Sequence, residues 1–165
     1  MFDSGIYVFV MRLREPCDIE VGSLGRFVFP AGWYLYTGSA RRNLRGRIER
    51  HWTLKKTLRW HIDHLSTAPD SEPVGAVVLP LEAGISECAL NQRVGRMIAG
   101  RTIAPGFGAS DCLSDCPAHL WYSRAAVSLL AIARIHPEAG VLIPGADIMQ
   151  PDLQSLLPEP EPDPD

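Results

Sequence analysis

The sequence predicts an α/β (α+β) fold, in which a small and mostly antiparallel central sheet is flanked by helices. Two observations support this prediction. Short runs of β-branched and aromatic residues, typical of strands, recur between Gly5 and Ser123. Between these runs lie segments in which apolar residues return every three or four positions, as they do on one face of a helix. A chain of 165 residues has the size of a single domain.

The first strand is expected at Gly5–Val10, which is rich in β-branched and aromatic residues. Successive side chains of a strand point to opposite faces, so the aromatic residues Tyr7 and Phe9 share one face. The other face carries Ile6, Val8 and Val10.

Two further strand segments, Arg26–Phe29 and Trp33–Thr37, flank a turn signal at Pro30–Gly32. The simplest arrangement of these three strands is an antiparallel meander. In that arrangement Tyr34 and Tyr36 share a face.

The middle of the chain is expected to be largely helical. Leu44, Ile48 and Trp52 recur at four-residue intervals, which predicts a helix from about Asn43 to Trp52. Gly46 weakens this helix by about 1 kcal/mol relative to Ala. The remaining elements, in chain order, are a helix at 58–66, a polar loop at 67–73, a buried strand at 73–79, a helix at 86–97, a loop over 100–117, a strand at 120–123 and an apolar helix at 125–135.

Three regions follow from this pattern. Residues 1–123 form the main domain, and residues 124–150 form a C-terminal extension that packs on it. Residues 151–165 are acidic and rich in proline, with proline alternating with acids over 158–165, and we expect this tail to be disordered.

The formal net charge of −3 hides a basic segment. Residues 151–165 contain five acids and no Lys or Arg, so residues 1–150 carry a formal charge of +2. Such a local basic field favours phosphate binding, although a solvated helix face has the same composition. The basic segment is residues 41–59, which contain half of the 16 Lys and Arg residues: Arg41, Arg42, Arg45, Arg47, Arg50, Lys55, Lys56 and Arg59.

The composition is that of a cytoplasmic protein. No apolar run approaches the ~20 residues that span a bilayer, and residues 1–4 lack the basic and apolar regions of a signal peptide. Four cysteines are too few for a disulfide scaffold in a chain of this length, so we expect thiols in a reducing compartment. No membrane partner is expected.

Five residues together have the chemistry that phosphodiester hydrolysis requires: Tyr7, Tyr36, Arg47, His51 and Glu87. The reaction needs a divalent cation, a positive group at the phosphoryl oxygens and a base for the attacking water. Arg47 and His51 lie four residues apart, hence on one face of the predicted helix. Taken singly, these residues are equally consistent with ordinary strand aromatics, a surface arginine and an acid near a helix N-terminus.

The order and spacing of these residues resemble the GIY-YIG nuclease superfamily, which includes homing endonucleases and the incision subunit of bacterial excision repair. Gly5-Ile6-Tyr7 resembles its first motif. Tyr36-Thr37-Gly38 resembles its second motif, with Thr37 where Ile or Val is usual. The later matches are Ser39-Ala40, Arg47, His51 and, for the metal-ligand acid of that superfamily, Glu87.

A closer resemblance is to a compact subfamily, the Uri-type endonucleases or DUF123-like proteins. It covers about residues 4–123 and is carried by the segments 33–40, 59–63, 87–88, 107–112 and 117–120. Two features depart from the pattern. The spacing from Tyr36 to Arg47 is one residue longer than in the homing enzymes, and the stretch Asp111–His119 is slightly expanded. Both leave the loop geometry open.

The resemblance implies that residues 1–123 are a GIY-YIG-type nuclease domain, a metal-dependent endonuclease for which DNA is the favoured substrate. One Mg²⁺ or Mn²⁺ ion would bind Glu87, and Arg47 would contact the scissile phosphate. Tyr7 or Tyr36 would orient or deprotonate the attacking water. His51 is an alternative base or proton shuttle, because histidine titrates near neutrality.

Nucleic acid is the expected partner, and its phosphates would lie along the basic segment. No separate targeting domain is visible, so a protein partner is a candidate source of specificity. The residues expected to contact nucleic acid are Ser39, Arg41, Arg42, Arg45, Arg50, Lys55 and Lys56.

His61 and Asp63 belong to one of the matching segments. They either approach the site or cap and tether helices, and the sequence leaves both roles open.

Cys112, Cys116 and His119 have a spacing that suits zinc, but a structural zinc site usually has four ligands. Cys88 is a candidate for the fourth ligand, but the sequence around it gives no sign of this role. We therefore do not expect zinc, and we interpret these residues as part of a loop folded over the site.

Two other functions fit the same sequence. A catalytically silent nucleic-acid-binding module on this fold would bind phosphates in a salt-sensitive way without cutting them. A zinc-stabilised interaction module built around the Cys112–His119 loop would unfold in chelator.

Overall fold

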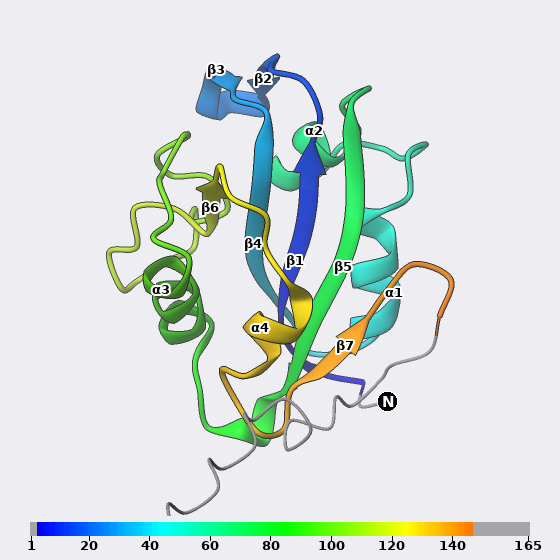
Figure 1. Ribbon diagram of the computed structural model, residues 1–165, viewed down its shortest axis with the longest axis vertical. Coiled ribbons are helices and arrows are strands. Elements are labelled where there is room, and N and C mark those ends of the chain that lie inside the picture. Colours follow the sequence, from blue (N-terminus) through cyan, green and yellow to red (C-terminus); the bar gives the residue numbers. More distant parts are fainter. Residues whose placement is uncertain (1–2, 147–165) are drawn as a thin grey trace, which may run out of the picture.

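The computed structural model describes residues 3–146, so the tail predicted at 151–165 lies outside the described residues. It confirms the predicted fold class. The described residues form a five-stranded antiparallel sheet, a two-stranded sheet and four α-helices (Figure 1). In this described part, no helix has both the length and the apolar character that crossing a membrane requires.

The strand order of the main sheet is β6-β4-β1-β5-β7. β1 lies at the centre and pairs along its length with β4 on one side and β5 on the other. The β1–β4 register places Tyr7 opposite Gly38. The strands are β1 (Gly5–Leu13), β4 (Gly32–Ala40), β5 (Ser71–Pro80), β6 (Leu120–Ser123) and β7 (Gly140–Leu142).

β1 is buried on both faces, and the predicted alternation is confirmed. Tyr7 and Phe9 belong to one core cluster, while the aliphatic residues Ile6, Val8 and Val10 belong to the other. Helices α1 (Leu44–His51) and α2 (His61–Ser66) pack on the face of the two aromatic residues. Helices α3 (Glu87–Met97) and α4 (Leu129–Ala133) pack on the other face, so the sheet is the middle of three layers.

The predicted meander is wrong in its pairing. β3 (Gly25–Phe29) does not pair with β4; it pairs with β2 (Cys17–Val21), a strand that the sequence analysis did not predict. The two form a separate ribbon at one end of the main sheet (Figure 1). β1 and β4 each have nine residues and match over that full length, whereas β3 has five, so the longer apolar pair forms the sheet.

The predicted helices at 43–52 and 86–97 are confirmed, and each has a side-chain cap. The Asn43 side chain accepts a hydrogen bond from the backbone of Gly46, and Ser86 accepts one from Ala89. α2 begins three residues later than predicted, because the Asp63 carboxylate accepts the backbone N–H of Trp60 and so fixes the helix start there.

The segment expected as a C-terminal extension supplies α4 and β7. α4 is shorter than the helix predicted at 125–135. β7 was not predicted, and it pairs with the outer edge of β5. Its three residues are too few for a detectable alternation, so the sequence pattern could not distinguish this strand from a loop.

Truncation of Ile132 should show that the extension belongs to the folded core. Ile132 is 1% exposed, whereas its neighbour Leu130 is 42% exposed. Ile132→Ala should lower the free energy of unfolding by about 2–5 kcal/mol, because a buried cavity replaces the side chain. Urea denaturation of both variants measures this, with Leu130→Ala as the matched control that stays near wild type. Equal small losses in the two variants would mean that the extension does not pack on the sheet.

Candidate functional site

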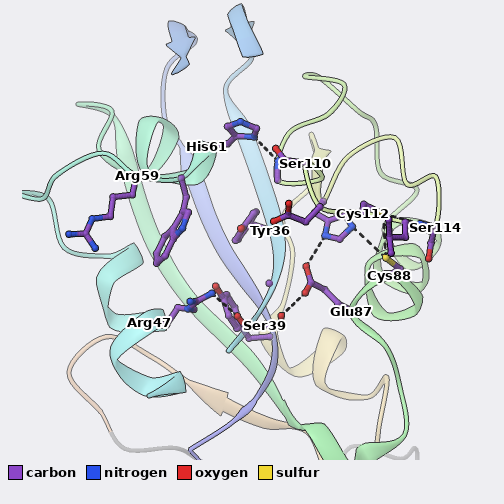
Figure 2. Close-up of a pocket in the computed structure, with 17 residues that line it drawn as sticks. Tyr36, Ser39, Arg47, Arg59, His61, Glu87, Cys88, Ser110, Cys112 and Ser114 are labelled. Carbon is purple, nitrogen blue, oxygen red and sulfur yellow. Dashed lines mark hydrogen bonds and ion pairs between the residues drawn. The ribbon is translucent and has the colours of Figure 1, made fainter. Parts of the chain in front are cut away.

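One edge of β4 is unpaired at its C-terminal end, beyond the residues that pair with β6. β6 pairs with β4 only from Trp33 to Tyr36, and no described strand pairs with Gly38–Ala40 on that edge. A pocket of about 600 Å³ lies there (Figure 2). It gathers residues from four elements that are distant in sequence: Tyr7 of β1, Tyr36 and Ser39 of β4, Arg47 of α1 and Glu87 of α3.

Ser39 connects the two helical layers at this edge. Its hydroxyl donates a hydrogen bond of 2.6 Å to Glu87 Oε2, and its carbonyl oxygen accepts one of 2.8 Å from the Arg47 guanidinium. From the sequence, Ser39 was expected to contact nucleic acid. The structure gives it a positioning contact with both Glu87 and Arg47.

Glu87 is held in its ionised form. Its Oε1 accepts a hydrogen bond of 2.9 Å from His119 Nδ1. Burial alone would raise the pKa of Glu87, but the hydrogen bonds from His119 and Ser39 outweigh burial and hold that pKa below its usual value. The same hydrogen bond to Glu87 raises the pKa of His119 to about 9.

Tyr7 and His51 form a buried pair behind the pocket. The Tyr7 hydroxyl lies 2.8 Å from His51 Nε2. Burial raises the pKa of Tyr7 well above its usual value and lowers the pKa of His51 to about 3, so the tyrosine is protonated and the imidazole neutral at pH 7. His51 is 1% exposed and reaches the pocket through Tyr7.

Two glycines allow the tyrosines to take these positions. A Cβ at Gly38 would lie 2.6 Å from the Tyr7 hydroxyl oxygen, and a Cβ at Gly108 would lie 2.7 Å from the Tyr36 ring. Gly108 also has a φ of +67°, which favours glycine. The Tyr36-Thr37-Gly38 motif therefore has a steric cause: its glycine makes room for the tyrosine of the neighbouring strand.

The pocket contains a second arginine that the sequence analysis did not single out as a site residue. Arg59 lines the pocket and is exposed. The Arg47 guanidinium lies over the Trp60 ring, 4.8 Å from its centroid, which restricts where that charge can move. The signal for Arg59 was present, since it stands next to Trp60 in a segment that carries the resemblance.

Arg50 and Lys56 are engaged inside the protein. Asp63 is fully buried, and its carboxylate accepts a hydrogen bond of 2.6 Å from Arg50 and lies 3.6 Å from Lys56 Nζ. The Lys56 side chain is only 3% exposed. Both cations were expected to bind nucleic acid, but in the structure they neutralise Asp63. Of the two roles left open for Asp63, capping and tethering is the one that the structure supports.

The other predicted contacts differ in accessibility. Arg41, Arg42 and Lys55 are exposed. Arg45 forms a 2.9 Å ion pair with Glu49, one turn along α1. His61 lines the pocket, where its Nδ1 accepts a hydrogen bond of 2.9 Å from the backbone of Gly108 and so tethers the loop that follows α3.

A second group of side chains lies at one side of the pocket, and Cys88, Cys112 and His119 of this group line it. Ligand atoms of Cys88, Cys112, Cys116 and His119 lie within 4.8 Å of one another, a grouping that could hold a metal ion. Cys88 directly follows Glu87 on α3, and its Sγ is 3.4 Å from that of Cys112. The last three residues were expected near the site, and Cys88 was a candidate fourth ligand for which the sequence held no local signal.

The family comparison covers this whole arrangement. The family described as "Domain of unknown function DUF123" matches residues 6–140. The chain belongs to this family. The DUF123 match includes every candidate site residue from Tyr7 to His119 and continues through α4 to the first residue of β7. Comparison with curated proteins and with solved structures gave no match.

Removal of the Asp63 charge should destabilise the protein strongly. Asp63→Asn leaves Lys56 buried without its counter-charge, and we expect a loss of about 3–5 kcal/mol in the free energy of unfolding. Asp70→Asn is the matched control, because the Asp70–Arg14 pair is exposed at 3.8 Å, and it should cost less than about 1 kcal/mol. Denaturant unfolding at pH 7 compares them.

The free energy of unfolding should depend differently on pH in wild type and in Asp63→Asn. Hydrogen bonds from Arg59 and Trp60 and the charges of Lys56 and Arg50 outweigh burial and lower the pKa of Asp63. A depressed folded-state pKa stabilises the protein above the unfolded pKa of about 4, and that stabilisation is lost as the pH falls through the folded value. The stability difference between wild type and Asp63→Asn should therefore narrow below about pH 4. A difference that is constant from pH 7 to pH 2 would contradict this assignment.

Proposed function

We propose that this protein is a metal-dependent endonuclease of the GIY-YIG type that hydrolyses phosphodiester bonds in nucleic acid, with DNA favoured. One observation carries the proposal. Tyr7, Tyr36, Arg47 and Glu87, which resemble the motif residues of that superfamily, come from four separate elements and line one pocket. The fold alone would not carry this function, because one fold serves many activities.

The charges in the pocket suit a phosphodiester. Arg47 and Arg59 supply positive charge on one side, and the ionised Glu87 lies across from Arg47 on the other side of Ser39. A guanidinium meets phosphate oxygens with fixed, paired hydrogen bonds. Because Arg47 is held by the Ser39 carbonyl and the Trp60 ring, it is positioned before substrate arrives.

Glu87 fits a divalent cation of the Mg²⁺ type. Each of its carboxylate oxygens accepts one hydrogen bond from the protein and retains a second acceptor site that can bind a metal. A single carboxylate suits Mg²⁺, which keeps several of its waters. When bound, the cation would neutralise phosphate charge and stabilise the leaving oxygen.

Tyr7 is the group best placed to orient the attacking water. In the tautomer of His51 with its proton on Nδ1, Nε2 accepts a hydrogen bond from the Tyr7 hydroxyl. The tyrosine oxygen then keeps its lone pairs for a water in the pocket. Burial opposes transfer of that proton to His51, while the charge of Arg47 lowers the pKa of Tyr7. His51 is thus proposed as a positioning residue and Tyr7 as the residue that contacts water.

Glu87→Gln should abolish cleavage while folding and binding persist. The substitution keeps the size of the side chain and removes the charge that a cation needs. The assay incubates wild type or the variant with Mg²⁺ or Mn²⁺ and one of four labelled substrates: single-stranded DNA, duplex DNA, branched DNA or RNA. Glu82→Gln, an exposed acid five residues earlier, is the matched control and should cut like wild type.

Two results would count against the proposal. Cleavage by Glu87→Gln at the wild-type rate would remove Glu87 from the mechanism. Absence of cleavage by wild type on every substrate, together with salt-sensitive binding, would favour a silent nucleic-acid-binding module.

Arg41 and Arg42 should contribute to affinity without contributing to the chemical step. Each phosphate contact that is lost should reduce the slope of log K against log salt by about 1. We expect this reduction for Arg41→Gln and Arg42→Gln in fluorescence anisotropy titrations. Arg93→Gln, an exposed change on α3, is the control. An unchanged slope in both Arg41 and Arg42 variants would place the phosphate contacts elsewhere.

A further inference from the structure

The chain between α3 and β6 is a long loop whose outer part lacks apolar anchors. No helix or strand lies between Met97 and Leu120. Ala104, Phe107 and Ala118 are buried and hold the two ends of this loop to the core. From residue 109 to 117, however, the side chains are exposed or only partly buried, and Leu113 is 98% exposed. Loops of this length are uncommon in compact domains, and those that occur are usually functional or disordered.

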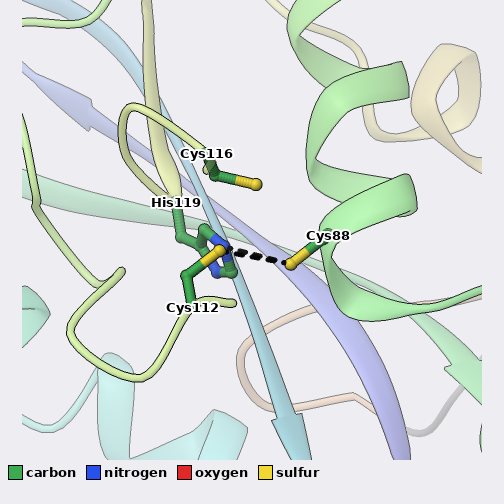
Figure 3. A group of neighbouring side chains, drawn as sticks. All are labelled: Cys88, Cys112, Cys116 and His119. Carbon is green, nitrogen blue, oxygen red and sulfur yellow. Dashed lines mark hydrogen bonds between the residues drawn. The ribbon is translucent and has the colours of Figure 1, made fainter. Parts of the chain in front are cut away.

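Within this outer part, only Ala109 and the two cysteines are partly buried. Cys112 and Cys116 approach Cys88, in the first turn of α3, and His119, directly before β6 (Figure 3). Cys88 Sγ lies 3.4 Å from Cys112 Sγ and 3.8 Å from His119 Nε2. All four ligand atoms lie within 4.8 Å of one another.

The distances of Cys88 Sγ from Cys112 Sγ and from His119 Nε2 are close to the edges of a metal-centred tetrahedron. Zinc binds thiolate sulfur at about 2.3 Å and histidine nitrogen at about 2.0–2.1 Å, so neighbouring ligands in tetrahedral geometry are about 3.5–3.8 Å apart. Three sulfurs and one imidazole nitrogen are soft and borderline ligands, which select zinc over Mg²⁺ or Ca²⁺. Four protein ligands leave no open position, as in structural zinc sites.

We propose that Cys88, Cys112, Cys116 and His119 bind one structural Zn²⁺ ion that fastens the outer loop to α3. This site is separate from the proposed Mg²⁺ ligand Glu87, and it stands whether or not the protein is a nuclease. The absence of a local fourth ligand was the reason not to expect zinc from the sequence. The fold removes that reason by bringing Cys88 to the other three.

Groups around the cluster have the arrangement of a zinc site's outer shell. His119 presents Nε2 to the sulfurs, while its Nδ1 is hydrogen-bonded to Glu87. A carboxylate on the second nitrogen of a histidine ligand fixes its tautomer and ring orientation. Two N–H donors also face the sulfurs: the backbone of Ser114 toward Cys112, at 3.5 Å, and the Gln92 amide toward Cys116, at 3.6 Å.

The zinc site and the pocket share the His119–Glu87 hydrogen bond. Zinc on Nε2 would hold the imidazole in place, and the imidazole N–H would hold Glu87 Oε1 at the pocket. Bound zinc would therefore also position the acid to which we assign the catalytic cation. That last step rests on the proposed function, whereas zinc binding does not.

Metal analysis of the full chain tests the site directly. Protein purified without chelator should contain about one zinc per chain by inductively coupled plasma mass spectrometry. Cys88→Ser, Cys112→Ser and Cys116→Ser should each lose most of it. Cys17→Ser is the matched control, because Cys17 is a partly buried thiol in β2 outside the cluster, and it should keep the zinc. Zinc that is absent from wild type, or equally present in all four variants, would overturn the proposal.

Wild-type protein provides a test that does not depend on the folding of variants. Cobalt exchanged into the site should give the visible ligand-field bands and near-ultraviolet thiolate charge-transfer bands of a tetrahedral site, and X-ray absorption of the zinc form should fit three sulfurs and one nitrogen. A shell of oxygen and nitrogen alone, or a Cys88–Cys112 disulfide found by mass spectrometry of the native protein, would overturn it.

Glu87→Gln should weaken zinc binding by about 10- to 100-fold, because it removes the charge that supports the histidine ligand. Competition with a chromophoric chelator measures this change, and Glu82→Gln should leave zinc affinity unchanged. An unchanged affinity in Glu87→Gln would overturn the coupling of Glu87 to the zinc site. Zinc content and cleavage are separate readouts, so failure of one proposal is distinguishable from failure of the other.

Discussion

Direct pairing of β1 with β4 is the constraint on which the candidate site depends. Their register places Tyr7 opposite Gly38, where the absence of a Cβ leaves room for the tyrosine hydroxyl. Side chains alternate between faces, so a shift of one residue would move Tyr7 into the opposite core and bring aliphatic residues into its place. Both faces of β1 are buried, which makes such a shift costly. The hydrophobic layers therefore fix the position of a polar group.

The site lies at a sheet edge because groups from opposite faces can meet only there. α1 packs on one face and α3 on the other, and the short β6 leaves the end of β4 uncovered. Ser39 occupies this end, and its hydroxyl and carbonyl bind one charged group from each layer. The acid and the arginine are thus fixed relative to one another through a single residue of the sheet.

Two kinds of ligand chemistry lie side by side on α3. Glu87 has carboxylate oxygens, which suit a hard cation, and Cys88, the next residue, has a sulfur, which suits a soft one. His119 lies between them, with one ring nitrogen toward each. The charges of the basic segment are likewise divided, since Arg50 and Lys56 neutralise the buried Asp63 while Arg47 and Arg59 line the pocket. Residues of the same type therefore serve structure and site within one short stretch of chain.

The sequence by itself determined the features that depend on near neighbours. Alternation in β1, four-residue spacing in α1 and the helix at 86–97 were all readable, because strand and helix periods repeat within a few residues. The candidate pocket residues were found through their resemblance to short motifs. Only the tertiary structure decided the direct pairing of β1 with β4, the Ser39–Glu87 contact across 48 residues and the approach of Cys88 to Cys112 across 24. These contacts depend on strand order and on which helix covers which face, and no local period carries that information.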